Sequence, residues 1–189
     1  QAKGFEIALD AFLADCRNKC TFSGTRDPGD AFDALMKQIR QHTYPTASGR
    51  PTLNLGITYT GVVNALYSQQ LWPVLDAALA AAGKGDGSGL LRLYDEYFQR
   101  KDDGTYGNEL EAFLAISCLD DRGPDSVAGV DAYNPQLAEI APRLGPSFEH
   151  SYACVFWPVA STPKIAVTGK GAGPIVVIGT TNDPATPFE

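Results

Sequence analysis

The fold class is decided by one stretch near the C-terminus, Gly173-Pro174-Ile175-Val176-Val177-Ile178-Gly179. An unbroken β-branched run is typical of a strand that is buried on both faces, as in a parallel sheet. Such a strand is not stable alone, because its backbone groups need neighbouring strands. The rest of the chain offers one weak candidate, the short alternating piece at 53–57. We therefore expect a strand at about 174–179 whose sheet lies largely outside these 189 residues.

Upstream of this strand, apolar residues recur at the spacing of amphipathic helices. In the first segment, Phe5, Leu9, Phe12, Leu13 and Cys16 form one such stripe. Helices are predicted at 1–20, 28–39 (with Asp27 as N-cap and Pro28 at N1), 59–67, 71–82, 89–100, 108–119 and 135–144 (with Asn134 as cap), and a polar loop at 120–133. The sequence therefore predicts a mainly α chain, a helical insertion followed by the first element of an α/β domain.

The composition is that of an acidic globular chain. Of the 189 residues, 44% are hydrophobic and 20% are charged, which is enough to bury a sizeable core. Fifteen Lys and Arg against 22 Asp and Glu give a net charge of −7, with no basic block. This charge argues against nucleic-acid binding. The longest apolar runs, such as 77–82, are far short of the roughly 20 residues that cross a bilayer, so no membrane span is predicted.

Motifs for nucleophilic, nucleotide or metal chemistry are missing from the sequence. A nucleophile elbow needs Gly-x-Ser-x-Gly, and the nearest look-alike, Asp86-Gly87-Ser88-Gly89, has the wrong spacing. The Gly-rich stretches around Lys84 and Lys170 match neither the Walker nor the dinucleotide pattern. The two histidines, His42 and His150, are interpreted as surface residues. No metal or cofactor is therefore predicted.

The four cysteines are an even set, Cys16, Cys20, Cys118 and Cys154, without a CxxC pair. Three disulfide connectivities are possible. Cys16 and Cys20 could be joined if the last helical turn loosens, which would leave Cys118 with Cys154. The alternative is four buried free thiols, because spacing alone does not exclude a reducing compartment. We favour oxidised cysteines, and hence an exported protein whose targeting segment has already been removed.

Asp183 follows the expected strand by a few residues, in a loop with Pro184 and Pro187. Open α/β sheets place binding and catalytic groups at this end of their strands. The prolines would stiffen the loop and hold the carboxylate in one direction, as required of a group that orients a histidine. The simpler alternative is an Asx-turn residue that caps the loop.

Several motifs, taken in order, resemble a known family. They are Phe5-Glu6-Ile7-Ala8-Leu9 with Phe12-Leu13-Ala14-Asp15-Cys16, Ala65-Leu66-Tyr67 with Leu71-Trp72-Pro73, Ala115-Ile116-Ser117-Cys118-Leu119-Asp120, Cys154-Val155-Phe156-Trp157-Pro158-Val159, and Asn182-Asp183-Pro184-Ala185-Thr186-Pro187. In this order they are similar to exported actinobacterial α/β-hydrolases of the tripeptidyl aminopeptidase type, which are related to prolyl aminopeptidases. The end of the chain resembles their TAP-like C-terminal region.

The resemblance implies a catalytic Ser, a helical lid, an Asp and a His, in this chain order. On this basis residues 1–150 are the lid (cap) domain, and residues 151–189 re-enter the α/β-hydrolase core, with the Asp loop at 181–188. Asp183 matches the triad acid, which holds the tautomer of the histidine and stabilises its protonated form. The Ser elbow would precede these residues and the His would follow them, so the chain alone is expected to be inactive.

The resemblance also bears on the cysteines and the partners. It implies a disulfide between Cys118 and Cys154, with Cys16–Cys20 as a local second bridge. The implied partners are the rest of the hydrolase core and a short peptide substrate, and the implied location is secreted or in the cell envelope of a bacterium.

An exopeptidase of this kind needs a carboxylate in the lid to pair with the free amino terminus. The candidates are Asp120, Asp121 and Glu111. Asp120 is favoured because it completes the Ala-Ile-x-Cys-x-Asp motif, and the alternative is a solvated acid at a helix end. Aromatic residues that could wall a peptide pocket are Trp72, Tyr94, Tyr97, Phe98 and Tyr106, although ordinary lid core is the stronger interpretation.

Two rival hypotheses remain open. One is a stand-alone helical binding or interaction module, which should pack Ile175–Ile178 internally, whereas a fragment leaves this run as an unpaired edge. The other is the lid of an esterase of the same fold, since lids differ more than triads do.

Overall fold

The computed structural model describes residues 1–189 except 121–122, 149–150, 162–164, 182 and 188–189. In this part the chain is mainly α-helical, and no strand is assigned. The elements are α1 (Ala2–Cys16), α2 (Pro28–Gln41), α3 (Leu55–Leu66), the 3₁₀ turn η1 (Gln69–Leu71), α4 (Trp72–Ala82), α5 (Ser88–Tyr97), α6 (Glu109–Asp120), α7 (Val127–Ile140), the 3₁₀ turn η2 (Gly145–Phe148) and α8 (Ser151–Val155).

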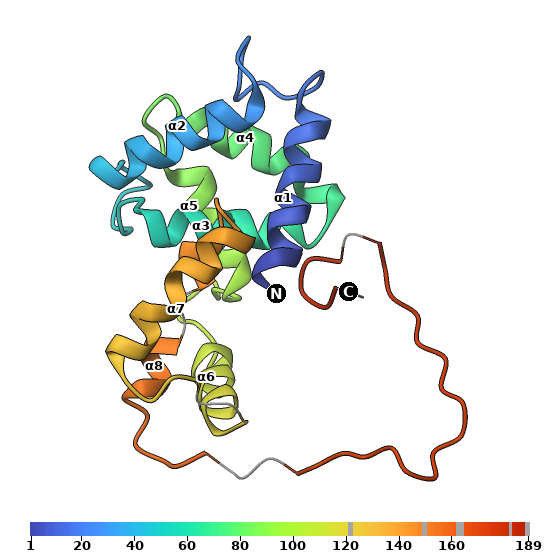
Figure 1. The fold of residues 1–189 in the computed structure, drawn as a ribbon. Helices are drawn as coiled ribbons and strands as arrows, with labels where there is room; N and C mark the ends of the chain where they lie inside the picture. The colour runs from blue at the N-terminus through green and yellow to red at the C-terminus, as the bar shows by residue number, and fades with distance from the viewer. Residues whose placement is uncertain (121–122, 149–150, 162–164, 182, 188–189) are drawn as a thin grey trace.

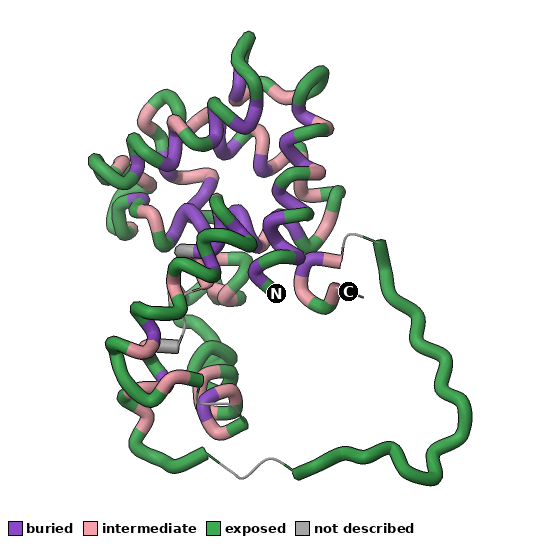
Figure 2. Tube along the Cα trace, in the orientation of Figure 1, coloured by how far each residue is buried: buried purple, intermediate pink, exposed green. Residues whose placement is uncertain are grey.

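Helices α1 to α5 are gathered into one body, and α6 to α8 lie beneath it in Figure 1. Most of the buried segments lie in this upper body, as the purple parts of the trace in Figure 2 show. Phe5, Leu9 and Phe12 of α1 belong with Phe32 of α2 to one apolar core, and each is at most 2% exposed. The apolar stripe predicted for the first helix is therefore confirmed as a core face.

The most extensive helix–helix contact among the described elements joins α3 to α5. The two backbones come close at Gly61, where a Cβ would lie 2.7 Å from the carbonyl oxygen of Leu90. The starts of α2 and α3 carry side-chain N-caps, which satisfy free N–H groups of the first helical turn. Asp27 accepts from the N–H of Gly29 at 2.8 Å, and Asn54 accepts from the N–H of Ile57 at 2.9 Å.

Glu6 of α1 is a buried carboxylate that reaches the end of the lower helices. Its oxygens accept backbone N–H groups from Arg143, at 3.1 and 3.3 Å, and from Leu144, at 2.9 Å. The Arg143 side chain in turn donates to Asp33 of α2 at 2.9 Å and to Asp10 of α1 at 3.2 Å. Burial raises the pKa of Glu6, and the two backbone donors oppose this shift. The segment after α7 is thus tied to α1 and α2 together.

The lower helices are joined by a disulfide between Cys118 of α6 and Cys154 of α8. Helix α6 packs on α8, α8 on α7, and α7 on α1. A second disulfide joins Cys16 at the end of α1 to Cys20. No free cysteine is found, so the predicted pairings are confirmed and the alternative of free thiols is contradicted.

The expected strand at 174–179 is not formed, so this prediction is not confirmed. Ile175, Val176, Val177 and Ile178 are between 69% and 92% exposed, in a segment without helix or strand. This segment passes around the outside of the helices, and the chain end returns beside the start of α1 (Figure 1). The physical reason is that a single strand has no partner for its N–H and C=O groups in the described part of the chain.

Several predicted boundaries are wrong. The first helix ends at Cys16 and not at 20, and α5 ends at Tyr97 and not at 100. Within the short alternating piece at 53–57, Leu53 forms an isolated bridge to Tyr44, Asn54 is extended and caps α3, and the helix begins at Leu55. Helix α7 begins at Val127, inside the predicted loop, because Ser126 caps it by accepting from the N–H of Gly129. Pro135 therefore lies within α7 and does not begin a helix after Asn134. The sequence reading also omitted α8.

None of the described helices is long and apolar enough to cross a membrane.

We expect Gly61→Ala to lower the free energy of unfolding by about 1–3 kcal/mol, because its methyl group would press against the backbone of α5. Urea unfolding followed by circular dichroism measures this change. The matched control is Gly56→Ala in the same helix, where the added Cβ meets only Oδ1 of Asn54, at 3.5 Å. Its stability should be unchanged or slightly higher, and equal losses in both variants would contradict the close approach of α3 and α5.

The two disulfides should contribute unequally to stability. Replacing Cys118 and Cys154 together by Ser opens a link across a sequence separation of 36 residues, which corresponds to about 3–4 kcal/mol of chain entropy. The control double variant at Cys16 and Cys20, with a separation of four residues, should lose only about 2 kcal/mol. Chemical denaturation measures both losses, and the reverse order would contradict the role assigned to the longer link.

Candidate functional site

The Asp183 turn (183–187) positions a carboxylate near the C-terminal end. Oδ1 of Asp183 accepts the backbone N–H groups of Ala185 and Thr186, both at 3.0 Å. Oδ2 accepts the hydroxyl of Thr186 at 2.9 Å. Pro184 lies between Asp183 and the first of these donors, Ala185, and has no N–H of its own. Asp183 therefore caps its own loop, as the Asx-turn alternative requires, and its carboxylate also has one defined direction.

The turn is seated on the first helix. Pro184 is buried, and Ala185 packs against the main core. A Cβ on Gly4 of α1 would lie only 2.5 Å from the carbonyl oxygen of Pro184 and 3.2 Å from the Pro187 ring. Gly4 is thus required because the loop backbone lies directly on α1. The packing of α1 therefore decides where the carboxylate sits.

The hydrogen bonds of the turn favour the ionised carboxylate. The backbone and hydroxyl donors of Thr186, with the N–H of Ala185, hold the pKa of Asp183 below its ordinary value. The group is therefore charged at neutral pH. A carboxylate oxygen has more than one lone pair, so Oδ2 can accept a further donor besides Thr186.

A hollow of about 430 Å³ lies beside Asp183. It is lined by Ala8, Ala11, Leu66, Tyr67, Gln69, Trp72, Thr180, Thr181, Asp183 and Pro184. Small residues of α1 leave the space, and aromatic residues wall it. The pKa of Tyr67 is raised, mainly by burial and then by Tyr97 and the Asp183 charge, so its phenol stays neutral and can donate a hydrogen bond. This hollow is large enough for a side chain of a ligand.

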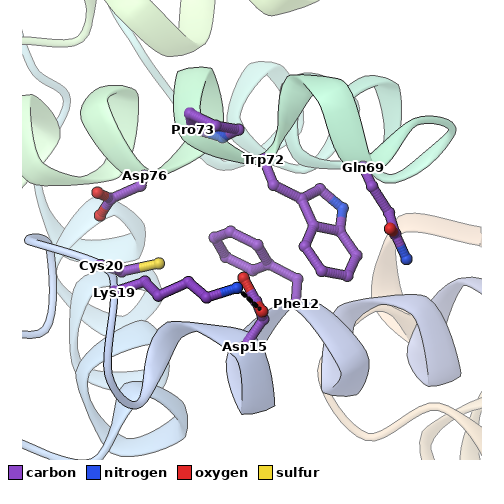
Figure 3. A pocket seen from close by; sticks show the side chains of 8 residues that line it. All are labelled: Phe12, Asp15, Lys19, Cys20, Gln69, Trp72, Pro73 and Asp76. Atoms are coloured by element: carbon purple, nitrogen blue, oxygen red, sulfur yellow. Dashed lines mark hydrogen bonds and ion pairs between the residues drawn. The ribbon is translucent and has the colours of Figure 1, made fainter.

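A second hollow of about 360 Å³ separates α1 from η1 and α4. Figure 3 shows Trp72 and Phe12 side by side in it, with the Lys19–Asp15 ion pair along its edge. The two rings meet edge to face, 5.7 Å apart. The Asp76 carboxylate binds the loop that follows the Cys16–Cys20 disulfide, since it accepts hydrogen bonds from Thr21 and Phe22. The contacts here hold the loop to α4, and we assign no ligand to this hollow.

Of the carboxylates proposed for amine binding, the two that the structure describes, Glu111 and Asp120, are not brought together. Glu111 lies in the first turn of α6 and Asp120 is its last residue, so the helix rise of 1.5 Å per residue separates them by about 14 Å. Both are exposed. Asp121 lies outside the described residues. Glu111 and Asp120 are therefore alternatives. Glu111 lines a small cavity where α5 gives way to α6, and Asp120 does not line it.

Nothing in the described residues gathers three His, Cys, Asp or Glu side chains into a metal site. His42 is exposed at the end of α2, and His150 lies outside the described residues. Two features were missed at the level of sequence, the hydroxyl of Thr186 on Asp183 and the place of Tyr67 beside the turn. The Asp-x-x-Thr spacing was a usable signal for the first, because it is typical of Asx-type turns. The second depends on the packing of α3 against α1.

We expect Thr186→Val to raise the pKa of Asp183 towards its ordinary value, because the hydroxyl donor to Oδ2 is lost. A folded-state pKa below the unfolded one stabilises the turn above that unfolded value, and this contribution is lost as pH falls through the folded pKa. In the variant this contribution should be smaller, and its loss should be complete at a higher pH. Carboxyl ¹³C NMR titration measures the shift, and Thr181→Val, at an exposed residue of the same loop, is the control. A pKa that does not move in Thr186→Val would rule out this hydroxyl as a cause.

Comparison with known proteins agrees with the motifs quoted above. Residues 141–189 match the family model described as TAP-like protein. Over its whole length the chain is 36% identical to Carboxylesterase B of Mycobacterium tuberculosis and 33% identical to Serine protease Hip1 of the same organism. It spans 38% and 39% of the length of these relatives. The resemblance inferred from the sequence is confirmed at this level: residues 141–189 are a TAP-like segment of the α/β-hydrolase type.

Proposed function

We propose that this chain is part of a secreted serine aminopeptidase of the tripeptidyl or prolyl type. Residues 1–150 would form its lid, and residues 151–189 would return to the α/β-hydrolase core. The enzyme would cleave short peptides from their amino end. The remaining core would supply the nucleophilic Ser and the catalytic His, and Asp183 would supply the triad acid.

The geometry of the Asp183 turn carries this proposal. A triad acid must stay ionised and must accept the Nδ1–H of the histidine from a fixed direction. Asp183 is held by three donors that lower its pKa, and Oδ2 keeps room for one more. In the assembled enzyme this carboxylate would hold the tautomer of the histidine and stabilise the imidazolium that forms when Ser is deprotonated.

The hollow beside Asp183 lies where the proposed lid would cover the reacting groups. Tyr67 and Trp72 wall it, and Ala8 and Ala11 form its small-residue side. A mainly apolar hollow with a few polar groups suits one side chain of a peptide. The ammonium end of the peptide would then lie further along the lid, near Glu111 or Asp120.

The exposed run Ile175–Ile178 supports the proposal that the chain is part of a larger fold and not a stand-alone module. A self-contained module would bury four such side chains, each worth about 1.5–3 kcal/mol. Paired into a parallel sheet of the core, the run would be buried on both faces. The two disulfides support export, because such bonds persist in oxidising compartments.

An esterase of the same architecture is the second candidate. It is favoured by the similarity to a relative named Carboxylesterase B. The triad chemistry is the same for an ester and an amide, so the lid pocket would decide between them.

The test is Asp183→Asn in the longer protein that contains this chain with its flanking residues. We expect hydrolysis of a tripeptidyl chromogenic substrate to fall by about 10³–10⁴-fold, because the histidine loses its tautomer partner. The matched control is Asp103→Asn, since Asp103 caps its own turn through Thr105 in the same way. Near-full activity in Asp183→Asn would sink the assignment. Cleavage of a short acyl ester without cleavage of any peptide would favour the esterase.

A further inference from the structure

A small cavity of about 160 Å³ lies where α5 gives way to α6, apart from the Asp183 turn. It is lined by Tyr94, Phe98, Tyr106, Gly107, Glu109, Leu110 and Glu111. Three aromatic rings and two carboxylates therefore face one space.

The rings are held in place by contacts within the protein. Tyr94 and Phe98 meet edge to face, with centroids 4.8 Å apart. The Tyr106 hydroxyl donates to Oδ1 of Asp95 at 2.7 Å, and the Arg50 guanidinium binds both oxygens of Asp95 at 2.6 Å. The charge of Arg50 is thus neutralised by Asp95. The walls are formed in advance, so little ordering is needed on binding.

The two carboxylates differ in how they are held. Glu109 accepts two hydrogen bonds from Nε2 of Gln99, at 3.0 and 2.9 Å. Glu111 is exposed and makes no ion pair in the part of the chain that the structure describes. Acidic residues also stabilise the first turn of a helix, but that role does not require three rings opposite them. Together the three rings and the two carboxylates make the space both aromatic and negative.

The chemistry of this space selects for a cation. Aromatic faces carry negative potential and attract ammonium groups, and the carboxylates exclude anions. The volume is close to the roughly 150 Å³ that admits benzene in an engineered cavity, so the group must be compact. We propose that the cavity binds an ammonium group, either the free amino end of a peptide or a methylated ammonium.

A row of rings connects this cavity with the hollow at Asp183. Tyr67, which lines that hollow, lies 6.4 Å from Tyr97, and Tyr97 lies 5.0 Å from Phe98 (ring centroids). A peptide whose ammonium occupies the cavity could run along these rings towards Asp183. This path rests on the proposed peptidase function and selects Glu111, not Asp120, as the carboxylate for the amino end. The binding of an ammonium by itself does not depend on catalysis.

The test measures binding to the 189-residue chain by NMR titration. The first pair of probes is tetramethylammonium and a neutral compound of similar size, neopentyl alcohol. The second pair is trialanine amide, which has a free amino end, and N-acetyl-trialanine amide, which does not. Tetramethylammonium should bind at least several-fold more tightly than the neutral alcohol, and the free peptide more tightly than the acetylated one. Equal affinities for tetramethylammonium and the alcohol would overturn the proposal. Equal affinities for the two peptides, with tetramethylammonium still bound, would overturn the peptide source and assign a methylated ammonium.

Variants then locate the site. Glu111→Gln should weaken tetramethylammonium binding by about threefold and Tyr106→Leu by about fivefold. Tyr106→Phe keeps the ring and should retain most of the affinity, which separates loss of the ring from loss of the hydroxyl contact with Asp95. Glu139→Gln, an exposed acid on α7, is the charge-matched control. Asp183→Asn should leave the affinity unchanged, so failure of the triad assignment stays distinguishable. Equal effects of Glu111→Gln and Glu139→Gln would contradict this location.

Discussion

The buried carboxylate of Glu6 is the constraint on which the arrangement of the chain depends. A carboxylate loses free energy when it leaves water unless donors replace its hydration. Here the donors are the backbone N–H groups of Arg143 and Leu144, so this position of α1 is stable only when the segment after α7 returns to it. The same helix carries Gly4, on which the Asp183 turn is seated. Residues far apart in sequence are therefore ordered by one helix.

The two candidate sites lie at the borders of the helical body rather than in its core. The Asp183 turn rests on α1, and the aromatic cavity lies at the passage from α5 to α6. The core itself is apolar and closely packed, with Gly61 marking how near the backbones of α3 and α5 approach. Sites at such borders can change with loops and neighbouring domains without disturbing the core. Such an arrangement would suit the proposed lid, because a pocket at a border could vary while the helical fold stays constant.

Local signals predicted most helices correctly, because capping and apolar periodicity act within one turn of chain. Asp27 with Pro28 is one example, and the stripe from Phe5 to Cys16 is another. The failures occur where tertiary packing outweighs local preference. Pro135 was read as a helix start, yet it lies inside α7, where Val130 and Leu137 on either side of it are buried. Asn54 ended an expected extended piece because its side chain caps α3.

By itself the sequence determined the helical character of the chain, the cysteine pairs that its family resemblance implied, and Asp183 as the residue of interest. These follow from spacing, motif order and turn chemistry, all of which are local. Only the tertiary structure decided that Thr186 and α1 hold Asp183, and that Glu111 shares a cavity with three aromatic rings while Asp120 does not. The strand-like run Ile175–Ile178 stays exposed. The physical reason is that a strand needs hydrogen-bonding neighbours, which can lie far away in sequence. The periodicity of one segment does not show where those neighbours are.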